Sequence, residues 1–237
     1  MSPNSSDDSP RNVGVVIPAG GSGARAGVGP LKQLRPIAGV PTLLRSIRPF
    51  AEHPRVREIV VPLPAAVADD PPDWLGRPPG APVRPVRGGA TRADSVRQGV
   101  RVLDPAVSIV LIHDAARPLV AADIIDRVLA AVDRGQCALA AIPVGDTLKR
   151  CGPDSDVVRE TVDRRDLWRA QTPQGFPRAT LVRCYDGPPA CFDGASWTDE
   201  ASLVEACGET TVVVMGSPIN LKVTTPEDFR IAEGLIG

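Results

Sequence analysis

Short apolar runs alternate with amphipathic segments along most of the chain. The apolar runs have the length of buried strands, whereas the amphipathic segments repeat their apolar positions with the helical period. The predicted strands are 13–18, 58–62, 108–113, 138–144 and 210–215, and the predicted helices are 41–50, 92–103, 123–133 and 227–235. This alternation predicts an α/β fold with a mainly parallel sheet, whose ligand sites lie at the carboxyl ends of the strands.

Two stretches depart from this alternation. Residues 62–85 are rich in proline, so they are predicted to be largely loop, with one short helix at 65–69 and a short strand at 83–86. Residues 146–163 carry two strand-like segments around a turn-rich centre, which predicts a β-hairpin inserted into the α/β order. A hairpin is only marginally stable alone, so it must pack on something.

The first twelve residues are polar and contain no apolar core, so residues 1–12 are predicted to form a disordered tail rather than a signal peptide. No linker divides the remainder. Residues 13–237 are therefore predicted to form a single domain that includes the inserted hairpin.

The composition argues against several classes of protein. The net charge is −1, without the basic stripe of nucleic-acid or membrane-surface proteins, and no apolar run has transmembrane length. The five cysteines are odd in number and form no C-x-x-C pair, which argues against a disulfide framework or a zinc site. We therefore expect a cytoplasmic protein with reduced thiols and with no nucleic-acid or membrane partner.

A glycine-rich loop, Pro18-Ala-Gly-Gly-Ser-Gly-Ala-Arg25-Ala-Gly-Val-Gly-Pro-Leu-Lys32, follows the first predicted strand. Glycines let backbone N–H groups approach phosphate oxygens, and Arg25 and Lys32 add positive charge suited to a polyphosphate. Residues 21–26 also fit the dinucleotide fingerprint, but the acidic residue expected about 20 residues later is missing. An ordinary strand-to-helix turn remains a third interpretation, whereas a Walker loop is excluded because G-K-[ST] is absent.

Six further motifs follow in order: Gly88-Gly-Ala-Thr-Arg-Ala-Asp-Ser95, His113-Asp-Ala-Ala-Arg-Pro118, Asp146-Thr-Leu-Lys149, Gln171-Thr-Pro-Gln174, Thr198-Asp-Glu-Ala-Ser202 and Asn220-Leu-Lys-Val-Thr224. With these motifs the chain, from Val13 to its C-terminus, resembles the 2-C-methyl-D-erythritol 4-phosphate cytidylyltransferases of the non-mevalonate isoprenoid pathway. The resemblance implies a three-layer, Rossmann-like nucleotidyltransferase fold with a mainly parallel mixed sheet. It also implies a protruding β-arm that joins two subunits into a homodimer, at the predicted hairpin.

The implied reaction is attack of a polyol-phosphate oxygen on the α-phosphorus of CTP, with release of pyrophosphate. A phosphate monoester is already anionic, so catalysis needs positioning and charge stabilisation rather than a general base. The resemblance assigns catalysis to Arg25, Lys32, Arg164 and Lys222. It assigns CTP binding to Ala19, Gly20, Gly21, Gly23, Arg25, Lys32, Gly89, Ser95, Asp114 and Lys222.

The resemblance assigns acceptor binding to Asp114, Arg117, Thr147, Arg164, Thr172 and Thr198, with Thr147 and Arg164 reaching across the dimer. Asp114 follows a predicted central strand and is the candidate ligand of Mg²⁺ or another divalent cation. Local roles compete with these assignments. Asp114 and Thr198 suit helix N-caps, and Lys222 suits an exposed edge strand. His113 is expected to be structural.

Two positions depart from the family pattern, in which proline directly precedes the loop lysine and an acidic residue often follows Gly89. Here Leu31 and Ala90 occupy these positions. Three other functions remain: a cytidylyltransferase for ribitol 5-phosphate or another polyol phosphate, an NAD(P)-dependent oxidoreductase that uses residues 21–26, and a non-catalytic nucleotide-binding dimer. A non-catalytic nucleotide-binding dimer would lack some of the charged site residues, yet this sequence contains all of them.

Overall fold

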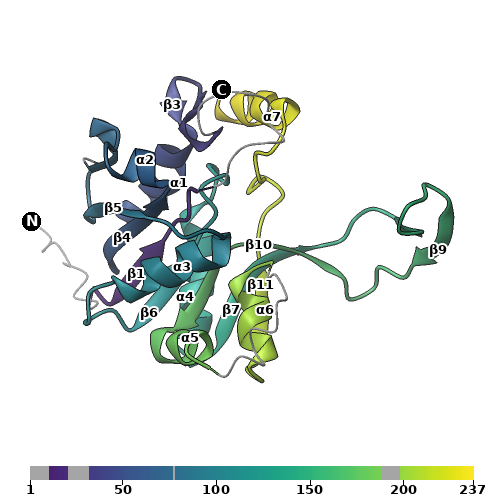
Figure 1. The fold of residues 1–237 in the computed structure, drawn as a ribbon. Helices are drawn as coiled ribbons and strands as arrows, with labels where there is room; N and C mark the ends of the chain where they lie inside the picture. Colours follow the sequence, from purple (N-terminus) through teal and green to yellow (C-terminus); the bar gives the residue numbers. More distant parts are fainter. Residues whose placement is uncertain (1–10, 21–31, 77, 188–197) are drawn as a thin grey trace, which may run out of the picture.

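The computed structural model describes residues 11–20, 32–76, 78–187 and 198–237. A central sheet organises these residues, with strand order β11-β7-β10-β6-β1-β4-β5 (Figure 1). Its strands are β1 (Val13–Val16), β4 (Val56–Leu63), β5 (Val83–Arg87), β6 (Ile109–Ile112), β7 (Cys137–Pro143), β10 (Trp168–Pro177) and β11 (Thr211–Met215). β10 pairs antiparallel with both β6 and β7, whereas the other pairings are parallel, so the sheet is mixed and mainly parallel as predicted.

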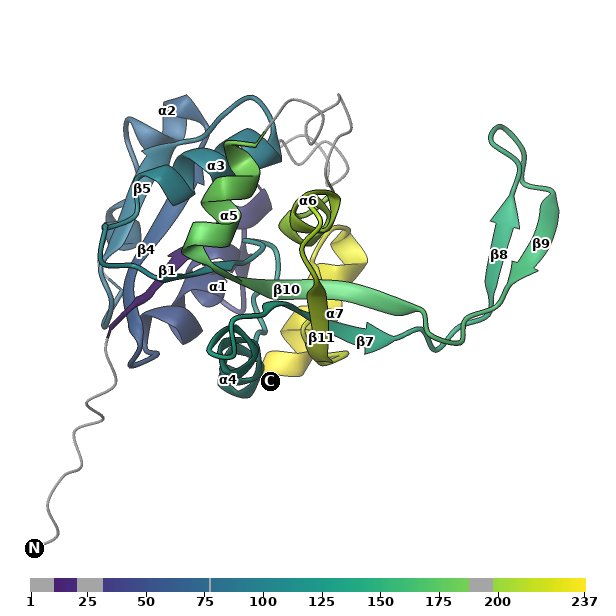
Figure 2. The same cartoon turned by 90° about the horizontal axis from the view of Figure 1, so that it is seen from below.

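Helices cover both faces of the sheet. They are α1 (Thr42–Ala51), α2 (Ala65–Ala68), α3 (Arg92–Arg101), α4 (Ala122–Val132), α5 (Arg178–Tyr185), α6 (Glu200–Ala206) and α7 (Pro226–Ile236), with short 3₁₀ helices η1 (Lys32–Leu34) and η2 (Asp73–Gly76). α1 and α4 cover one face, and α3, α5 and α6 cover the other (Figure 2). The three-layer α/β prediction is confirmed.

The two layers follow from the alternation of side chains along the strands. In β1, Val13 and Val15 pack with Leu43 and Ile47 of α1, whereas Val16 packs with the apolar side of α3. The core consists mainly of valine, leucine, isoleucine and alanine, in keeping with the low aromatic content. Strands that are buried on both faces explain why the sequence shows continuous apolar runs rather than alternation.

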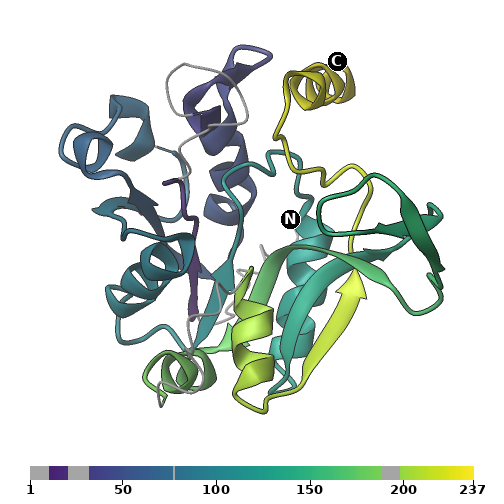
Figure 3. The ribbon, with the colours of Figure 1, turned by 45° about the vertical axis from the view of Figure 1, so that its right-hand side comes forward.

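The predicted hairpin stands away from the body. β8 (Leu148–Cys151) and β9 (Val158–Val162) pair antiparallel in a two-stranded sheet of their own, and both strands are largely exposed. We call residues 146–163 the arm. Figure 3 shows the arm projecting from the side of the molecule where β7, β10 and β11 lie. A second small hairpin pairs β2 (Pro36–Ile37) with β3 (Val40–Pro41).

Three local features differ from the sequence-based expectations. β10 was not predicted, because Pro173 and the polar residues around it break its apolar pattern. Lys222, whose position suited an edge strand, lies in a segment that forms no strand. Asn12, assigned to the tail, belongs to the body, because its carbonyl oxygen accepts hydrogen bonds from the N–H groups of Ser108 and Ile109. Residues 1–10 lie outside the described residues. Among those described, no helix is long and apolar enough to cross a membrane.

Candidate active site

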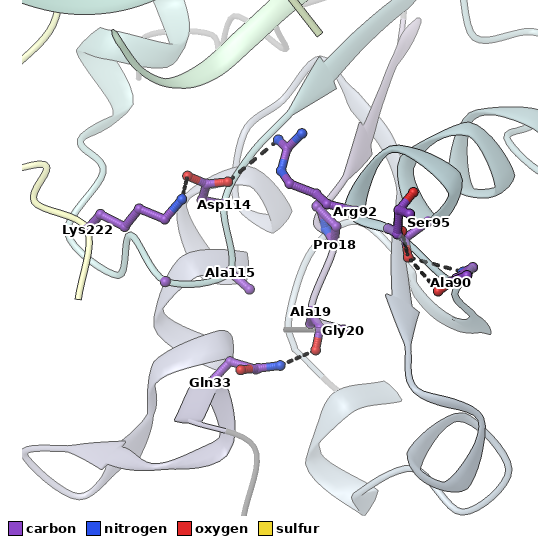
Figure 4. Close-up of a pocket in the computed structure, with 13 residues that line it drawn as sticks. Pro18, Ala19, Gly20, Gln33, Ala90, Arg92, Ser95, Asp114, Ala115 and Lys222 are labelled. Carbon is purple, nitrogen blue, oxygen red and sulfur yellow. Dashed lines mark hydrogen bonds and ion pairs between the residues drawn. The ribbon is translucent and has the colours of Figure 1, made fainter. Parts of the chain in front are cut away.

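A cavity of about 430 Å³ opens at the carboxyl ends of β1 and β6. The segment after β1 contributes Pro18, Ala19 and Gly20, the turn before α3 contributes residues 89–91, and α3 itself contributes Arg92 and Ser95. Residues 114–116 after β6, together with Gln33 and Lys222, complete the lining (Figure 4). The cavity therefore lies where a parallel sheet is expected to bind its ligands.

Asp114 lies at the centre of a cluster of positive charge. Lys222 Nζ is 3.0 Å from Asp114 Oδ2, Arg117 Nε is 3.5 Å from the same oxygen, and Arg92 Nη2 is 3.6 Å from Oδ1. In Figure 4, Lys222 and Arg92 approach the carboxylate from opposite sides. Asp114 and Arg117 are each 9% exposed, so this pair is shielded from water, whereas Lys222 reaches Asp114 from the exposed side.

The surroundings keep Asp114 ionised. Burial by itself opposes ionisation, but the charges of Lys222, Arg92 and Arg117 outweigh it and hold the pKa of this carboxyl well below its ordinary value. The N–H of Asp114 also donates a 3.0 Å hydrogen bond to the Thr172 hydroxyl. Asp114 is therefore a fixed negative charge that orders the cations lining the cavity. This is a different role from the N-cap that its position also suited.

A buried carboxylate anchors Arg92 from behind. Arg92 Nη1 donates to both carboxylate oxygens of Glu200, at 2.9 and 3.0 Å, and Glu200 is only 2% exposed. Burial raises the pKa of Glu200, and the charge of Arg92 opposes this rise. Arg92 thus spans two carboxylates, Glu200 and Asp114, and its guanidinium is held at the edge of the cavity.

The turn between β5 and α3 is built around the Ser95 hydroxyl. Gly89 N donates to Ser95 Oγ at 3.1 Å, and that hydroxyl donates to the Thr91 carbonyl at 2.9 Å. Thr91 and Asp94 form a capping box at the start of α3. A Cβ at position 89 would lie 2.3 Å from the Cβ of Asp94, so glycine is required there. Gly89, Ala90 and Ser95 all line the cavity.

His113 and Thr172 form a buried hydrogen-bond network next to Asp114. The His113 ring is fully buried, and its pKa is lowered to about 4 because burial disfavours the imidazolium. Nε2 lies 3.1 Å from the Arg117 carbonyl and Nδ1 lies 2.9 Å from the Thr172 hydroxyl. This network assigns the proton to Nε2 and makes Thr172 the donor to Nδ1. The Thr172 hydroxyl is therefore already used twice, by His113 and by Asp114 N–H.

The buried neutral His113 predicts a specific pH dependence of stability. Between about pH 6.5 and pH 4, an unfolded chain binds a proton at this histidine that the folded chain does not. The free energy of unfolding should therefore fall by about 3 kcal/mol more in the wild type than in a His113→Gln variant as the pH is lowered through this window. Urea denaturation at several pH values measures the difference.

The chain's other histidine, His53, provides the control, since a His53→Gln variant keeps His113 intact. The control should keep the part of the fall in stability that His113 contributes. Parallel pH profiles for the wild type and His113→Gln would contradict the buried neutral assignment.

The guanidinium of Arg117 mainly contacts other groups of the protein. Its Nη1 donates to the Asn220 carbonyl at 2.7 Å, and Nη2 lies 3.4 Å from the Ala170 carbonyl. Burial lowers its pKa, and Asp114 opposes this change. Arg117 does not line the cavity in the described part of the chain. The predicted contact of Arg117 with a substrate phosphate stays a prediction. In the structure, Arg117 also has a second role, as a partner of Asp114.

Thr198 is exposed and is not the N-cap of α6. Asp199 takes that position instead, because its carboxylate accepts a 3.0 Å hydrogen bond from the N–H of Ser202. Gln174 fixes this helix start by donating to Asp199 Oδ2 at 2.8 Å and accepting from Ala201 N at 3.1 Å. The capping interpretation of Thr198 was therefore wrong by one residue.

Thr147 and Arg164 lie at the base of the arm, and both are exposed. Neither lines the cavity formed by the described residues of this chain. Arg164 donates to the carbonyl of Gly145, which links the two strands that lead into the arm. Within one chain, the structure does not bring these residues together with Asp114.

Part of the glycine-rich loop lies outside the described residues. Ala19 and Gly20 line the cavity, and Gln33 Nε2 donates to the Ala19 carbonyl. Their assignment to CTP binding stays a prediction. Gly21, Gly23 and Arg25, as well as the side chain of Lys32, fall outside the described structure.

The sequence profile of the 2-C-methyl-D-erythritol 4-phosphate cytidylyltransferases matches residues 13–237. The chain belongs to this family. It is therefore a nucleotidyltransferase. Among curated members, the cytidylyltransferase of Symbiobacterium thermophilum is 46% identical over 224 residues, which cover 94% of this chain and 92% of the relative. A bifunctional IspD/IspF enzyme of Anaeromyxobacter dehalogenans is also 46% identical, and the match spans 57% of that longer relative.

Solved structures of cytidylyltransferases share the fold. The enzyme of Thermus thermophilus is 32% identical, with a TM-score of 0.76 over 94% of this chain and 98% of the other. That of Francisella tularensis is 28% identical, with a TM-score of 0.79 over 94% of this chain and 99% of the other. These similarities do not favour the ribitol phosphate or oxidoreductase alternatives.

Three residues in or behind the cavity were not among the candidates predicted from the sequence: Gln33, Arg92 and Glu200. Arg92 and Gln33 line the cavity, and Glu200 holds Arg92. A signal for Arg92 was present, since it lies between the glycine turn and Ser95 inside a recognised motif. Glu200 lies 108 residues from Arg92, so only the fold pairs the two side chains.

Proposed function

We propose that the chain transfers CMP from CTP to 2-C-methyl-D-erythritol 4-phosphate and releases pyrophosphate, as a step of isoprenoid precursor synthesis. The observation that carries this proposal is the convergence of Lys222 and Arg92 on Asp114, beside the Gly88–Ser95 turn, in a chain of this family. One side of the cavity offers positive charge to phosphates. The other offers backbone groups and a hydroxyl to a base.

CTP binding divides between these two sides. The backbone at Gly89 and Ala90 and the Ser95 hydroxyl select the cytosine. The triphosphate lies toward Lys222 and Arg92, and the family resemblance assigns Arg25 and Lys32 of the glycine-rich loop to it as well. This placement is supported by the cavity lining and by the order of the family motifs. Ala90 lacks the acidic side chain common at this position, so the base contact rests on the backbone there.

The reaction is an in-line displacement at the α-phosphorus. An anionic oxygen of the acceptor phosphate forms the new P–O bond while the bond to the β-phosphate oxygen breaks, and the electron pair leaves with pyrophosphate. Charge on the transferring phosphoryl group and on the leaving group is stabilised by fixed cations. Lys222 is suited to align the attacking phosphate, because Asp114 holds its ammonium at a defined place.

A divalent cation fits this site as a companion of the nucleotide. In the described residues, no group of three or more His, Cys, Asp or Glu side chains could hold a metal ion. Mg²⁺ is commonly bound by one or two carboxylates together with substrate phosphates and waters, and Asp114 offers one such carboxylate in the cavity. Bound there, Mg²⁺ would neutralise charge on the phosphates.

The arm is proposed to join two chains into a homodimer that works in the cytoplasm. Its strands are largely exposed. Val158 at the start of β9 is 51% exposed, and Val157 just before it is 72% exposed. A two-stranded ribbon is marginal alone. A two-fold partner would cover these side chains. Thr147 and Arg164 at the base of the arm would then reach the acceptor phosphate in the partner's site, and Thr198 would contact the polyol.

Acceptor choice tests the proposal. Pyrophosphate release from CTP should be much faster with 2-C-methyl-D-erythritol 4-phosphate than with ribitol 5-phosphate at equal concentration. A coupled pyrophosphate assay with both acceptors, and with no acceptor as the blank, makes the comparison. Equal or faster turnover with ribitol 5-phosphate would contradict the assigned acceptor.

A further inference from the structure

Lys222 is held in place without regular secondary structure. It lies between β11 and α7, in a segment (216–225) that forms neither helix nor strand, yet its ammonium is 3.0 Å from Asp114. A lysine side chain is long and has several rotatable bonds. Its position in the cavity therefore depends on how firmly the surrounding backbone is fixed.

The first anchor of this segment is Gln171, which comes from β10. Its Nε2 donates to the Ser217 carbonyl at 2.8 Å, and its Oε1 accepts from Ser217 N at 3.2 Å. The amide thus binds the backbone of one residue through both donor and acceptor. A Cβ at Gly216 would lie 2.3 Å from Gln171 Oε1, so glycine leaves the space that this contact needs.

The second anchor is Asn220, which is completely buried two residues before Lys222. Its Nδ2 donates to the Thr172 carbonyl at 2.8 Å, and Arg117 Nη1 donates to the Asn220 carbonyl at 2.7 Å. On the other side of Lys222, Val223 N donates to the Ala116 carbonyl at 2.8 Å. The backbone on both sides of Lys222 is therefore fastened to β10 and to the loop after β6, the elements that also carry and support Asp114.

We propose that Asn220 and Gln171 are positioning residues for cytidylyl transfer, which act by holding the backbone of Lys222 so that its ammonium meets Asp114 and the phosphates. Neither side chain lines the cavity among the described residues. The inference rests on the proposed function and adds to it. It distinguishes the residue that contacts the phosphates, Lys222, from the residues that fix its position.

A double-mutant cycle tests this inference, because residues that act through one another are not additive. Asn220→Ala should lower kcat by about 10- to 100-fold, the scale expected for a small misplacement of a catalytic group. In a Lys222→Ala background the same substitution should change kcat by less than about twofold, since the group it positions is gone. Equal fold losses in both backgrounds would overturn the inference.

A second variant covers the case in which Asn220→Ala does not fold. Gly216→Ala removes no polar group but displaces Gln171 from Ser217, and it should show the same non-additivity with Lys222→Ala. Asn12→Ala is the matched control. Asn12 donates to Ser108 Oγ at 3.0 Å and accepts from Arg55, and it precedes β1 at the opposite end from the cavity. It should leave kcat near the wild-type value, and melting temperatures identify any variant that is merely unstable.

The same double-mutant cycle is also carried out with the affinity for CTP as the measured quantity. Calorimetry gives this affinity and requires no acceptor. If wild type bound CTP but did not turn over the assigned acceptor, the proposed function would fail, and the affinity cycle would still test the positioning role. Loss of affinity in Asn220→Ala that vanishes in the Lys222→Ala background supports positioning. Independent, multiplying losses contradict it.

Discussion

Asp114→Asn should lower kcat/KM by about 100-fold or more, because it removes the charge that orders the cavity's cations while keeping the shape of the side chain. Lys222 and Arg92 would lose the carboxylate that holds them at 3.0 and 3.6 Å. Steady-state kinetics with CTP and the acceptor measure the loss. The loss should appear mainly in kcat rather than in KM if Lys222 acts in the transition state.

Asp133→Asn is the control for this substitution. Asp133 also pairs with an arginine, Arg55, through contacts of 2.7 and 2.9 Å, but it follows α4 and does not line the described cavity. Its replacement should leave kcat/KM within about twofold of wild type, as for most surface ion pairs. A folded Asp114→Asn variant with near-normal kinetics would show that this carboxylate has no part in the reaction.

Two inactive chains should restore activity when they form one dimer. Arg164→Ala removes the proposed contribution of the arm, and Lys222→Ala removes a group of the CTP cavity in the other subunit. In a mixed dimer, one of the two sites carries both wild-type groups, so activity should recover to about half of the wild-type value. Co-expression with two different tags and tandem purification isolates the mixed dimer for the assay.

Arg165→Ala is the matched control for the arginine. Arg165 is adjacent to Arg164 and pairs with Asp163 in its own chain, at 2.9 Å, so its loss should leave turnover near wild type. A purified mixed dimer as inactive as either parent would mean that Arg164 acts within its own subunit. The arm would then have no part in a shared site.

The elements that could be predicted are those with an unbroken period. The runs that became β1, β6 and β7, and the part of β4 from Ile59 onward, are continuously apolar because both faces of these strands are covered, and α4 shows one clear apolar face. β10 was missed because it carries Gln171, Pro173 and Gln174, and each glutamine is buried through hydrogen bonds to distant segments. Hydrogen bonds to distant segments leave no periodic pattern in the local sequence.

The residues of the site also fall into two groups, those that could be found from the sequence and those that only the fold reveals. Asp114, Ser95, Gly89 and Lys222 could be found from motifs, and all four line the cavity. The anchors Glu200 and Asn220 could be found only in the fold, since each acts through a residue that is remote in sequence or through the backbone. Motifs point to groups that face a ligand, whereas the residues that hold those groups depend on tertiary contacts.

The proposed function requires that this chain moves the α-phosphorus of CTP onto an organic phosphate. The most direct measurement uses CTP labelled with ³²P at the α-position, incubated with 2-C-methyl-D-erythritol 4-phosphate and Mg²⁺, followed by chromatographic separation of the products. We predict that the label appears in a cytidine diphosphate ester of the acceptor, that unlabelled pyrophosphate is released in equal amount, and that UTP or ATP replaces CTP poorly. Label that stays in CTP, or that appears only as free CMP, would contradict this activity.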